Sequence, residues 1–216
     1  MKKLIFAIVL FVSPCLVKAQ VGQGLFVGGG LGYSSSKSKT TNGSSSFEGS
    51  RTSTFEITPR IGYFFTDNFG AGLNIGYSNI VTPDESDPDV KLINNAISFG
   101  LFGRYALPLG DESKFAFTGD LNIGYSSITG KYVVGSISES ADPIGILSFN
   151  IMPGILFFPT PKIGIEAGLG NILGVNVATQ RSLDNNDFKR VTTSLEVFNI
   201  RSLNLNFGLN YYFNRS

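Results

Sequence analysis

Five charged side chains interrupt otherwise apolar, alternating segments, and they are the residues of this chain best suited to chemistry. They are Glu56, Arg60, Arg104, Asp120 and Glu166. Two carboxylates held close together could act as a general acid and base, whereas carboxylates beside guanidinium groups form ion pairs. The chain has no histidine, which argues against Ser–His–Asp hydrolases and the usual zinc sites. Since no substrate motif accompanies the carboxylates, the sequence predicts a non-enzymatic protein without cofactor or metal.

A second acidic group lies in one polar connection and contains Asp84, Glu85, Asp87 and Asp89. It could hold a divalent cation, such as one that bridges the phosphates of lipopolysaccharide. It lacks the spacing and the central glycine of an EF-hand loop. We therefore interpret this group as part of a solvated loop.

The five interrupting charges share one parity within segments in which every second residue is apolar. Side chains alternate between the two faces of a β-strand, so this pattern predicts strands with one apolar face. Eight such segments can be recognised, and the apolar positions in each are odd-numbered. The segments are 25–33, 55–65, 69–77, 97–105, 115–125, 147–157, 163–175 and 203–213.

Long polar and short connections alternate between these segments. The long connections are 35–50, 82–92, 129–143 and 179–190. Short turns at one end and long loops at the other are typical of outer-membrane barrels. The sequence thus predicts an all-β fold, an eight-stranded antiparallel up-and-down transmembrane β-barrel with both termini at the short-turn end. Residues 191–202 are expected to form the upper part of a long, bulged eighth strand.

The N-terminus has the form of a secretory signal peptide. A basic start and a nine-residue apolar run, Leu4 to Val12, precede Val17-Lys18-Ala19, which predicts cleavage before Gln20. We expect residues 1–19 to be the signal peptide and residues 20–216 to be the barrel domain. A lipoprotein signal that uses Cys15, the single cysteine, is the alternative, although Pro14 suits it poorly.

The charge of the mature domain gives no sign of a nucleic-acid partner. Cleavage removes three of the 17 lysines and arginines, which leaves 14 basic against 16 acidic residues. A nucleic-acid-binding domain would carry a basic patch.

Alternation alone does not say whether the apolar face points outward to lipid or inward, as in a soluble periplasmic lipocalin-like binder. The polar face consists mainly of Gly, Ser, Thr and Asn, which would make a poor solvated surface. Tyrosines near strand ends all share the apolar face, as the aromatic girdles of a membrane barrel require. These are Tyr33, Tyr63, Tyr77, Tyr105, Tyr125 and Tyr211. The sequence therefore favours the apolar-out arrangement.

With that orientation, the five charged residues point into the lumen. An eight-stranded barrel is narrow enough for its own side chains to fill it, and buried charges must be paired. We expect a network of ion pairs and asparagines to close the lumen, and Asn204, Asn206 and Asn210 should be part of this network. The alternative is a selective path for protons or small solutes. Phe26, Phe64, Phe102 and Phe158 also point inward, which indicates a plug or an apolar mouth at one end.

The last strand carries a feature of bacterial outer-membrane proteins. In 203–213 every odd position is apolar, and Phe207, Leu209, Tyr211 and Phe213 resemble the C-terminal signature that the barrel-assembly machinery reads in bacterial outer-membrane barrels, although Asn214-Arg215-Ser216 follow the final aromatic. On these grounds residues 21–213 resemble the small OmpA/OmpX-like outer-membrane β-barrel family.

This resemblance implies a porin-like monomer in the Gram-negative outer membrane, in contact with outer-membrane lipids and lipopolysaccharide and inserted by the assembly machinery. It implies roles from envelope integrity to adhesion or narrow transport. We expect a structural or surface-interaction barrel whose long loops could bind an extracellular ligand. A narrow channel or carrier for small or hydrophobic solutes is the alternative.

Overall fold

The computed structural model describes residues 22–42, 45–84, 87, 89–110, 114–182, 189–197 and 206–215. These residues form ten strands: β1 (Gly24–Asn42), β2 (Ser45–Phe64), β3 (Phe69–Pro83), β4 (Val90–Leu109), β5 (Phe115–Val134), β6 (Ile137–Thr160), β7 (Ile163–Gly168), β8 (Leu173–Arg181), β9 (Lys189–Val197) and β10 (Asn206–Tyr212). The expected signal peptide, residues 1–19, lies outside them. None of the described residues belongs to a helix long and apolar enough to cross a membrane.

The ten strands occupy eight positions in a closed antiparallel ring. β7 and β8 both pair with β6, so they are two halves of the seventh position. β9 pairs with β8 and β10 pairs with β7, so these two share the eighth position. β10 also pairs with β1, with Phe26 opposite Tyr212 and Gly30 opposite Gly208. The predicted eight-stranded up-and-down barrel is confirmed. The bulge expected within 191–202, near Arg201, lies outside the described residues.

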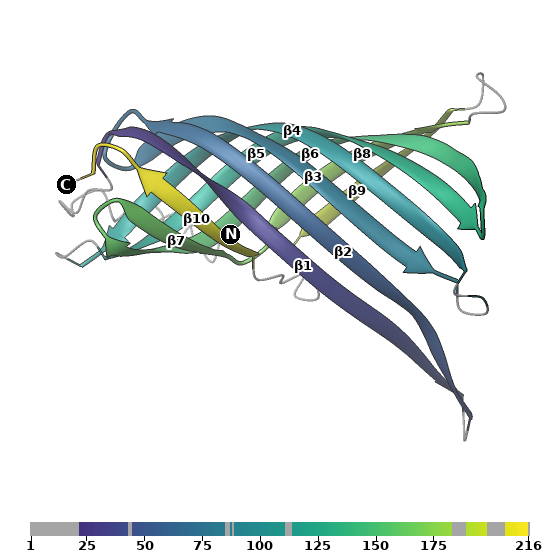
Figure 1. Cartoon of the computed structure of the whole chain (residues 1–216). Helices are drawn as coiled ribbons and strands as arrows, with labels where there is room; N and C mark the ends of the chain where they lie inside the picture. Colours follow the sequence, from purple (N-terminus) through teal and green to yellow (C-terminus); the bar gives the residue numbers. More distant parts are fainter. Residues whose placement is uncertain are drawn as a thin grey trace, which may run out of the picture.

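The two ends of the barrel differ, as Figure 1 shows. The connections β2–β3 and β6–β7 are short and lie at the end where the C-terminus is found. The β1–β2, β3–β4, β5–β6 and β8–β9 hairpins end on the opposite side. In an outer-membrane barrel the short turns face the periplasm, so the hairpin ends are the extracellular side.

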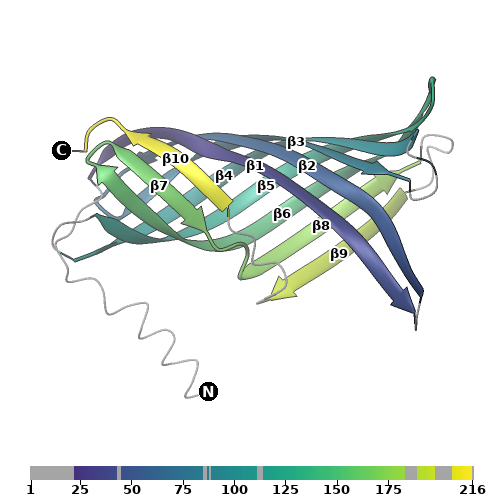
Figure 2. The same cartoon turned by 60° about the horizontal axis from the view of Figure 1, so that its bottom comes forward.

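Two of the four predicted long loops, 35–50 and 129–143, are wrong for much of their length, because the sheet continues through them. β1 runs to Asn42, which lies opposite Ser45 of β2, so 35–50 is mostly the end of a hairpin. β5 and β6 pair through most of 129–143 in the same way. A ladder needs only backbone groups, so polar Ser/Thr-rich segments extend strands beyond the hydrocarbon. The β1–β2 hairpin projects past the rest of the wall (Figures 1 and 2).

The apolar face of the sheet points outward. Leu31, Phe99, Leu101 and Leu209 are exposed, as are all six girdle tyrosines named above, whereas Phe26 and Arg104 are fully buried inside. A lipocalin-type binder requires the opposite arrangement, with its apolar face inside. The structure therefore favours the membrane orientation.

Candidate functional site

The lumen contains a layer of charged side chains drawn from strands on all sides of the ring. Arg60 lies on β2, Arg104 on β4, Asp120 on β5 and Glu166 on β7. The alternating pattern of each strand turns these residues inward, and Arg104 lies directly opposite Asp120 in the β4–β5 ladder. Two guanidinium groups and two carboxylates meet there, so the layer is neutral overall.

Arg104 is the centre of this layer. Its Nε donates to Asp120 Oδ1 at 2.7 Å, and its Nη1 donates to Glu166 Oε2 at 2.7 Å, across the lumen. Its Nη2 donates to Glu166 Oε1 at 2.8 Å and also contacts Asp120 Oδ2. A buried charge is tolerated only when it is paired and hydrogen-bonded, and Arg104 meets both conditions. The side chain thus links β5 with β7.

Arg60 completes the layer from another side. Its Nη2 contacts Glu166 Oε2, its Nη1 donates to Glu166 Oε1 at 3.3 Å, and its Nε donates to Asn210 Oδ1 at 3.0 Å. Asn210 Nδ2 in turn donates to Glu166 Oε2 at 3.1 Å. The expected participation of Asn210 is thereby observed, while Asn204 and the side chain of Asn206 lie outside the described residues.

Glu56 is the one predicted lumen residue that the structure keeps apart from this layer. It has the inward parity of Arg60 but lies four residues nearer the extracellular end of β2, and it is exposed. It lines the open upper part of the lumen instead. Glu56 is therefore not paired with a second carboxylate for acid–base chemistry. Asp120 and Glu166 are both engaged in ion pairs with guanidinium groups.

An aromatic plug lies on the periplasmic side of the charged layer. It consists of Phe26, Phe64, Phe102, Phe158 and Tyr212, all buried. Phe26 is the centre, with ring centroids 5.5 Å from Phe64, 6.1 Å from Phe102 and 5.4 Å from Tyr212. The Arg104 guanidinium lies 5.9 Å from the centre of the Phe26 ring, so the plug and the charged layer are in contact.

The C-terminal tail covers the plug from below. The Arg215 guanidinium carbon lies 3.3 Å from the centre of the Phe158 ring. Partial burial lowers the pKa of Arg215 from its ordinary value, and the nearby Tyr212 opposes that shift. The parity of the strands predicts that these phenylalanines point inward. It does not predict that the C-terminal tail packs against them.

Above the charged layer the lumen opens into a polar cavity of about 580 Å³. Amide pairs cross its wall, with Asn74 Nδ2 donating to Asn122 Oδ1 and Asn171 Nδ2 to Asn150 Oδ1, each at 3.3 Å. Most other lining residues are small or hydroxyl-bearing: Gly29, Gly30, Thr58, Ser98, Thr118, Ser126 and Ser148. Arg60, Asp120 and Glu166 form its floor. The sequence predicts Asn204, Asn206 and Asn210 in this network but not these amides, although Asn74, Asn122 and Asn150 have the inward parity.

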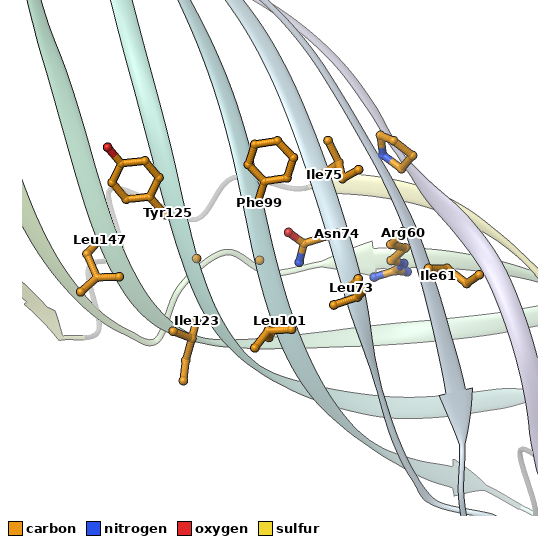
Figure 3. Close-up of a pocket in the computed structure, with 13 residues that line it drawn as sticks. Arg60, Ile61, Leu73, Asn74, Ile75, Phe99, Leu101, Ile123, Tyr125 and Leu147 are labelled. Atoms are coloured by element: carbon orange, nitrogen blue, oxygen red, sulfur yellow. The ribbon is translucent and has the colours of Figure 1, made fainter.

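A second hollow of about 590 Å³ lies on the outer wall between β2 and β6. Figure 3 shows Ile61, Leu73, Phe99, Ile123 and Leu147 along it. These residues have the outward parity, so the hollow faces hydrocarbon and needs nothing beyond acyl chains to fill it. The pairing of β2 with β3 is interrupted nearby at Pro59, which has no amide hydrogen to donate.

The acidic connection contains no metal cluster in its described part. Asp87 Oδ1 accepts a hydrogen bond from the backbone N–H of Asp89 at 3.0 Å, and Glu85 lies outside the described residues. Across the described ranges, no three His, Cys, Asp or Glu side chains are grouped to hold a metal ion.

The residues of the proposed assembly signal lie on the outer face of β10 and just beyond it. Phe207, Leu209, Tyr211 and Phe213 are all exposed. Phe213 donates its backbone N–H to Leu25 O at 3.0 Å, which extends the β1–β10 contact past the end of the strand. This placement leaves the four side chains accessible; their reading by an assembly machine stays a prediction.

A closed antiparallel ring with apolar residues outside and charged residues inside defines an integral β-barrel of the bacterial outer membrane. In agreement with this class, residues 5–213 match the model of the outer membrane protein beta-barrel domain family. The chain belongs to this family, and the resemblance to small OmpA/OmpX-like barrels is confirmed. The cleavage site before Gln20 stays a prediction.

Three solved structures are similar to this chain in fold. Neisserial surface protein A is 16% identical, with 89% of this chain and 99% of that chain covered and a TM-score of 0.40. Ail, the attachment invasion locus protein of Yersinia pestis, is 16% identical, with 89% and 100% covered and a TM-score of 0.42. A major outer membrane protein from Thermus thermophilus is 12% identical, with 89% and 100% covered and a TM-score of 0.44. No curated protein matches the sequence, so the family assignment rests on the domain match.

Proposed function

We propose that this protein is a closed, non-enzymatic barrel with a structural or surface-interaction role in the outer membrane. The observation that carries the proposal is the position of the Arg104 side chain across the lumen. This side chain is fully buried and hydrogen-bonded to Asp120 on one side of the lumen and to Glu166 on the other. A solute that crossed here would have to break these charge-assisted bonds, which are among the stronger ones in proteins.

The aromatic plug adds a second barrier in series with the first. Phe26, Phe64 and Tyr212 fill the lumen immediately on the periplasmic side of the charged layer. Ions and sugars would have to shed water to pass between these rings. Two different barriers in series support a filled lumen better than either one alone.

The extracellular surface supports the interaction part of the proposal. The β1–β2 hairpin projects beyond the other strands, and its described residues Ser34, Ser35, Ser36 and Lys37 are exposed. Exposed segments on a rigid scaffold commonly carry binding functions. An extracellular ligand on this hairpin, like insertion by the barrel-assembly machinery and a monomeric state, is part of the proposal.

Swelling of liposomes in an isotonic sugar solution tests the closed lumen. Vesicles that contain the folded protein should swell no faster than vesicles without protein, whereas a general porin gives rapid swelling. Heat-modifiable gel migration of the same vesicles confirms that the barrel is folded. Porin-like swelling with a folded barrel would overturn the proposal.

A second candidate function is that of a carrier for small or hydrophobic solutes, and the upper cavity favours it. The cavity is lined by inward residues but also by Leu31, Tyr33 and Phe207, which have the outward parity. Pairing of β1 with β10 ends at Gly30, just before Leu31, although Phe207 of β10 is still paired with β7. The cavity thus reaches the wall of the barrel at the place where β1 leaves β10.

Calorimetric titration with a medium-chain fatty acid in detergent micelles would test this carrier. Binding that is abolished by Thr58→Trp, which fills the cavity, and retained in Thr129→Trp on the outer parity would support it. Equal behaviour of the two variants would contradict it.

A further inference from the structure

The polar side chains of the upper cavity lie in register with glycines on the neighbouring strands. The pairs are Thr58 and Gly30, Ser98 and Gly76, Asn74 and Gly100, Thr118 and Gly154, Ser148 and Gly124, and Asn150 and Gly174. At each of these glycines a Cβ would lie no more than 3.4 Å from the polar side-chain atom of its partner. The partner side chain therefore lies across the neighbouring strand, against the wall. An eight-stranded barrel is narrow enough for side chains to fill it, so this arrangement keeps the cavity of about 580 Å³ open.

Two amide groups on one side of this cavity have unused hydrogen-bond donors. Asn122 of β5 and Asn150 of β6 are opposite each other in the β5–β6 ladder, and both line the cavity. Their Oδ1 atoms accept hydrogen bonds from Asn74 and Asn171, each at 3.3 Å. Their Nδ2 groups have no hydrogen-bond partner among the residues that the structure describes. Both Nδ2 groups are therefore available to a molecule in the cavity.

A carboxylate lies on the opposite side of the ring. Glu56 is on β2, which β3, β4 and β5 separate from β6, and it lines the same cavity. It is exposed, and it forms no hydrogen bond or ion pair within the described ranges. The charges of the floor below it are balanced, since two guanidinium groups face two carboxylates there. Glu56 therefore gives the cavity an unpaired negative charge and a strong hydrogen-bond acceptor.

These groups select the chemistry of a ligand. A molecule that fills the cavity must accept hydrogen bonds from the two amides and donate one to Glu56, and a hydroxyl group can do both. Glu56 would repel an anion, and a hydrocarbon chain would leave the amides and the carboxylate without partners. The volume lies within the range of small-molecule sites, about 300–1,000 Å³. Gly32, Tyr33 and Glu56 of the upper lining are exposed, so entry is from the extracellular side.

We propose that the upper lumen is a binding site, open to the extracellular side, for a neutral polyhydroxylated solute such as a short saccharide. Asn122 and Asn150 donate to its oxygens, and Glu56 accepts from its hydroxyls. The inference deepens the proposed surface-interaction role and rests on the closed floor, because a closed cavity retains a ligand that an open one would pass. Porin-like swelling would overturn the closure, whereas a barrel that neither swells vesicles nor binds saccharide would overturn the site alone.

The test is saturation-transfer NMR of maltotriose with the folded barrel in phosphatidylcholine nanodiscs, which carry no sugar headgroups. Maltotriose should give a saturable signal. Maltotrionate, which has similar hydroxyls but a carboxylate at one end, should bind more weakly because Glu56 repels it. Absence of a saturable maltotriose signal would show that the cavity holds water only and would overturn the proposal, as would tighter binding of octanoate.

Glu56→Gln tests the charge without disturbing the fold, because Glu56 is exposed and unpaired in the described part of the chain. The substitution keeps an acceptor and removes the negative charge. Maltotriose and maltotrionate should therefore bind this variant with equal affinity. A preference for maltotriose that persists unchanged in Glu56→Gln would overturn the assignment of this carboxylate to the site.

A matched pair of double variants locates the donors. Asn122→Leu with Asn150→Leu removes both amide groups and should weaken maltotriose binding about tenfold, since two hydrogen bonds are lost. Asn79→Leu with Asn95→Leu removes a similar amide pair, bonded at 2.9 Å on the outer face of β3 and β4, and should leave binding unchanged. Heat-modifiable migration establishes that each variant is folded. Equal binding by the two double variants would overturn the proposal.

Discussion

Arg104 and Asp120 face each other across the β4–β5 ladder, and the guanidinium Nε lies 2.7 Å from the carboxylate Oδ1 inside the lumen. The same guanidinium reaches Glu166 on β7, so one side chain holds opposite walls of the barrel together. The fold places the pair in register, and the full burial of Arg104 makes each bond strong. The stability of the barrel and the proposed closure of its lumen therefore depend on the same residues.

Replacing Arg104 with methionine should destabilise the barrel by about 3–5 kcal/mol, because Asp120 and Glu166 would lose a buried partner. Urea unfolding in lipid vesicles, followed by gel migration, measures this loss. Lys162→Met in the β6–β7 turn is the matched control and should change stability by less than about 0.5 kcal/mol. Equal effects of the two substitutions would contradict the assigned role of Arg104.

Arg60 and Glu166 should be energetically coupled. In a double-mutant cycle with Arg60→Met and Glu166→Gln, we expect the effects to depart from additivity by about 0.5–3 kcal/mol, as residues in one network do. The same cycle with Arg51→Met in place of Arg60→Met should be additive, since Arg51 is on the outer face. Additivity in both cycles would show that the contact contributes nothing.

Gly62 should tolerate no side chain. A Cβ there would lie 2.6 Å from two carbons of the Phe26 ring, whereas a Cβ at Gly119 would have nothing within 4 Å. Gly62→Ala should therefore cost about 1–3 kcal/mol by overpacking the plug, and Gly119→Ala should be neutral or slightly stabilising. Comparison of their unfolding midpoints checks the position of the plug; a stable Gly62→Ala barrel would argue against it.

Phe213→Ala should reduce the amount of barrel assembled in the outer membrane of living cells, while refolding of the purified variant into vesicles should be close to normal. Phe117→Ala is the matched control, since Phe117 is 50% exposed and Phe213 45%. Both variants lose a similar lipid-facing ring, so only a recognition signal would separate them. Normal assembly of Phe213→Ala would remove the support for such a signal.

The strand parity in the sequence was enough to predict the ring, the outward face and the inward direction of the lumen charges. It could not predict which charges meet. Arg60 and Glu166 lie on strands on different sides of the ring, and their contact depends on the tilt of the strands, which a single strand does not reveal. For the same reason Glu56 shares the parity of Arg60 but lies higher in the barrel, away from the carboxylates.

The hairpin ends were mispredicted for a different reason. The polarity of 35–50 predicts a loop, yet it reflects the passage of β1 and β2 from hydrocarbon into water, where the ladder continues. The tail that brings Arg215 over Phe158 had no periodic signal, because it follows the last strand. Periodicity predicts which way a strand residue faces, but not where the sheet ends.

Current recordings across a planar bilayer that contains the folded wild-type barrel test the closed lumen most directly. We predict no steady single-channel steps, because the Arg104 layer and the Phe26 plug both block the path. Steady steps in the wild-type protein that change in size with Arg104→Met, but not with the Lys162→Met control, would show that ions pass through this layer and would contradict the account.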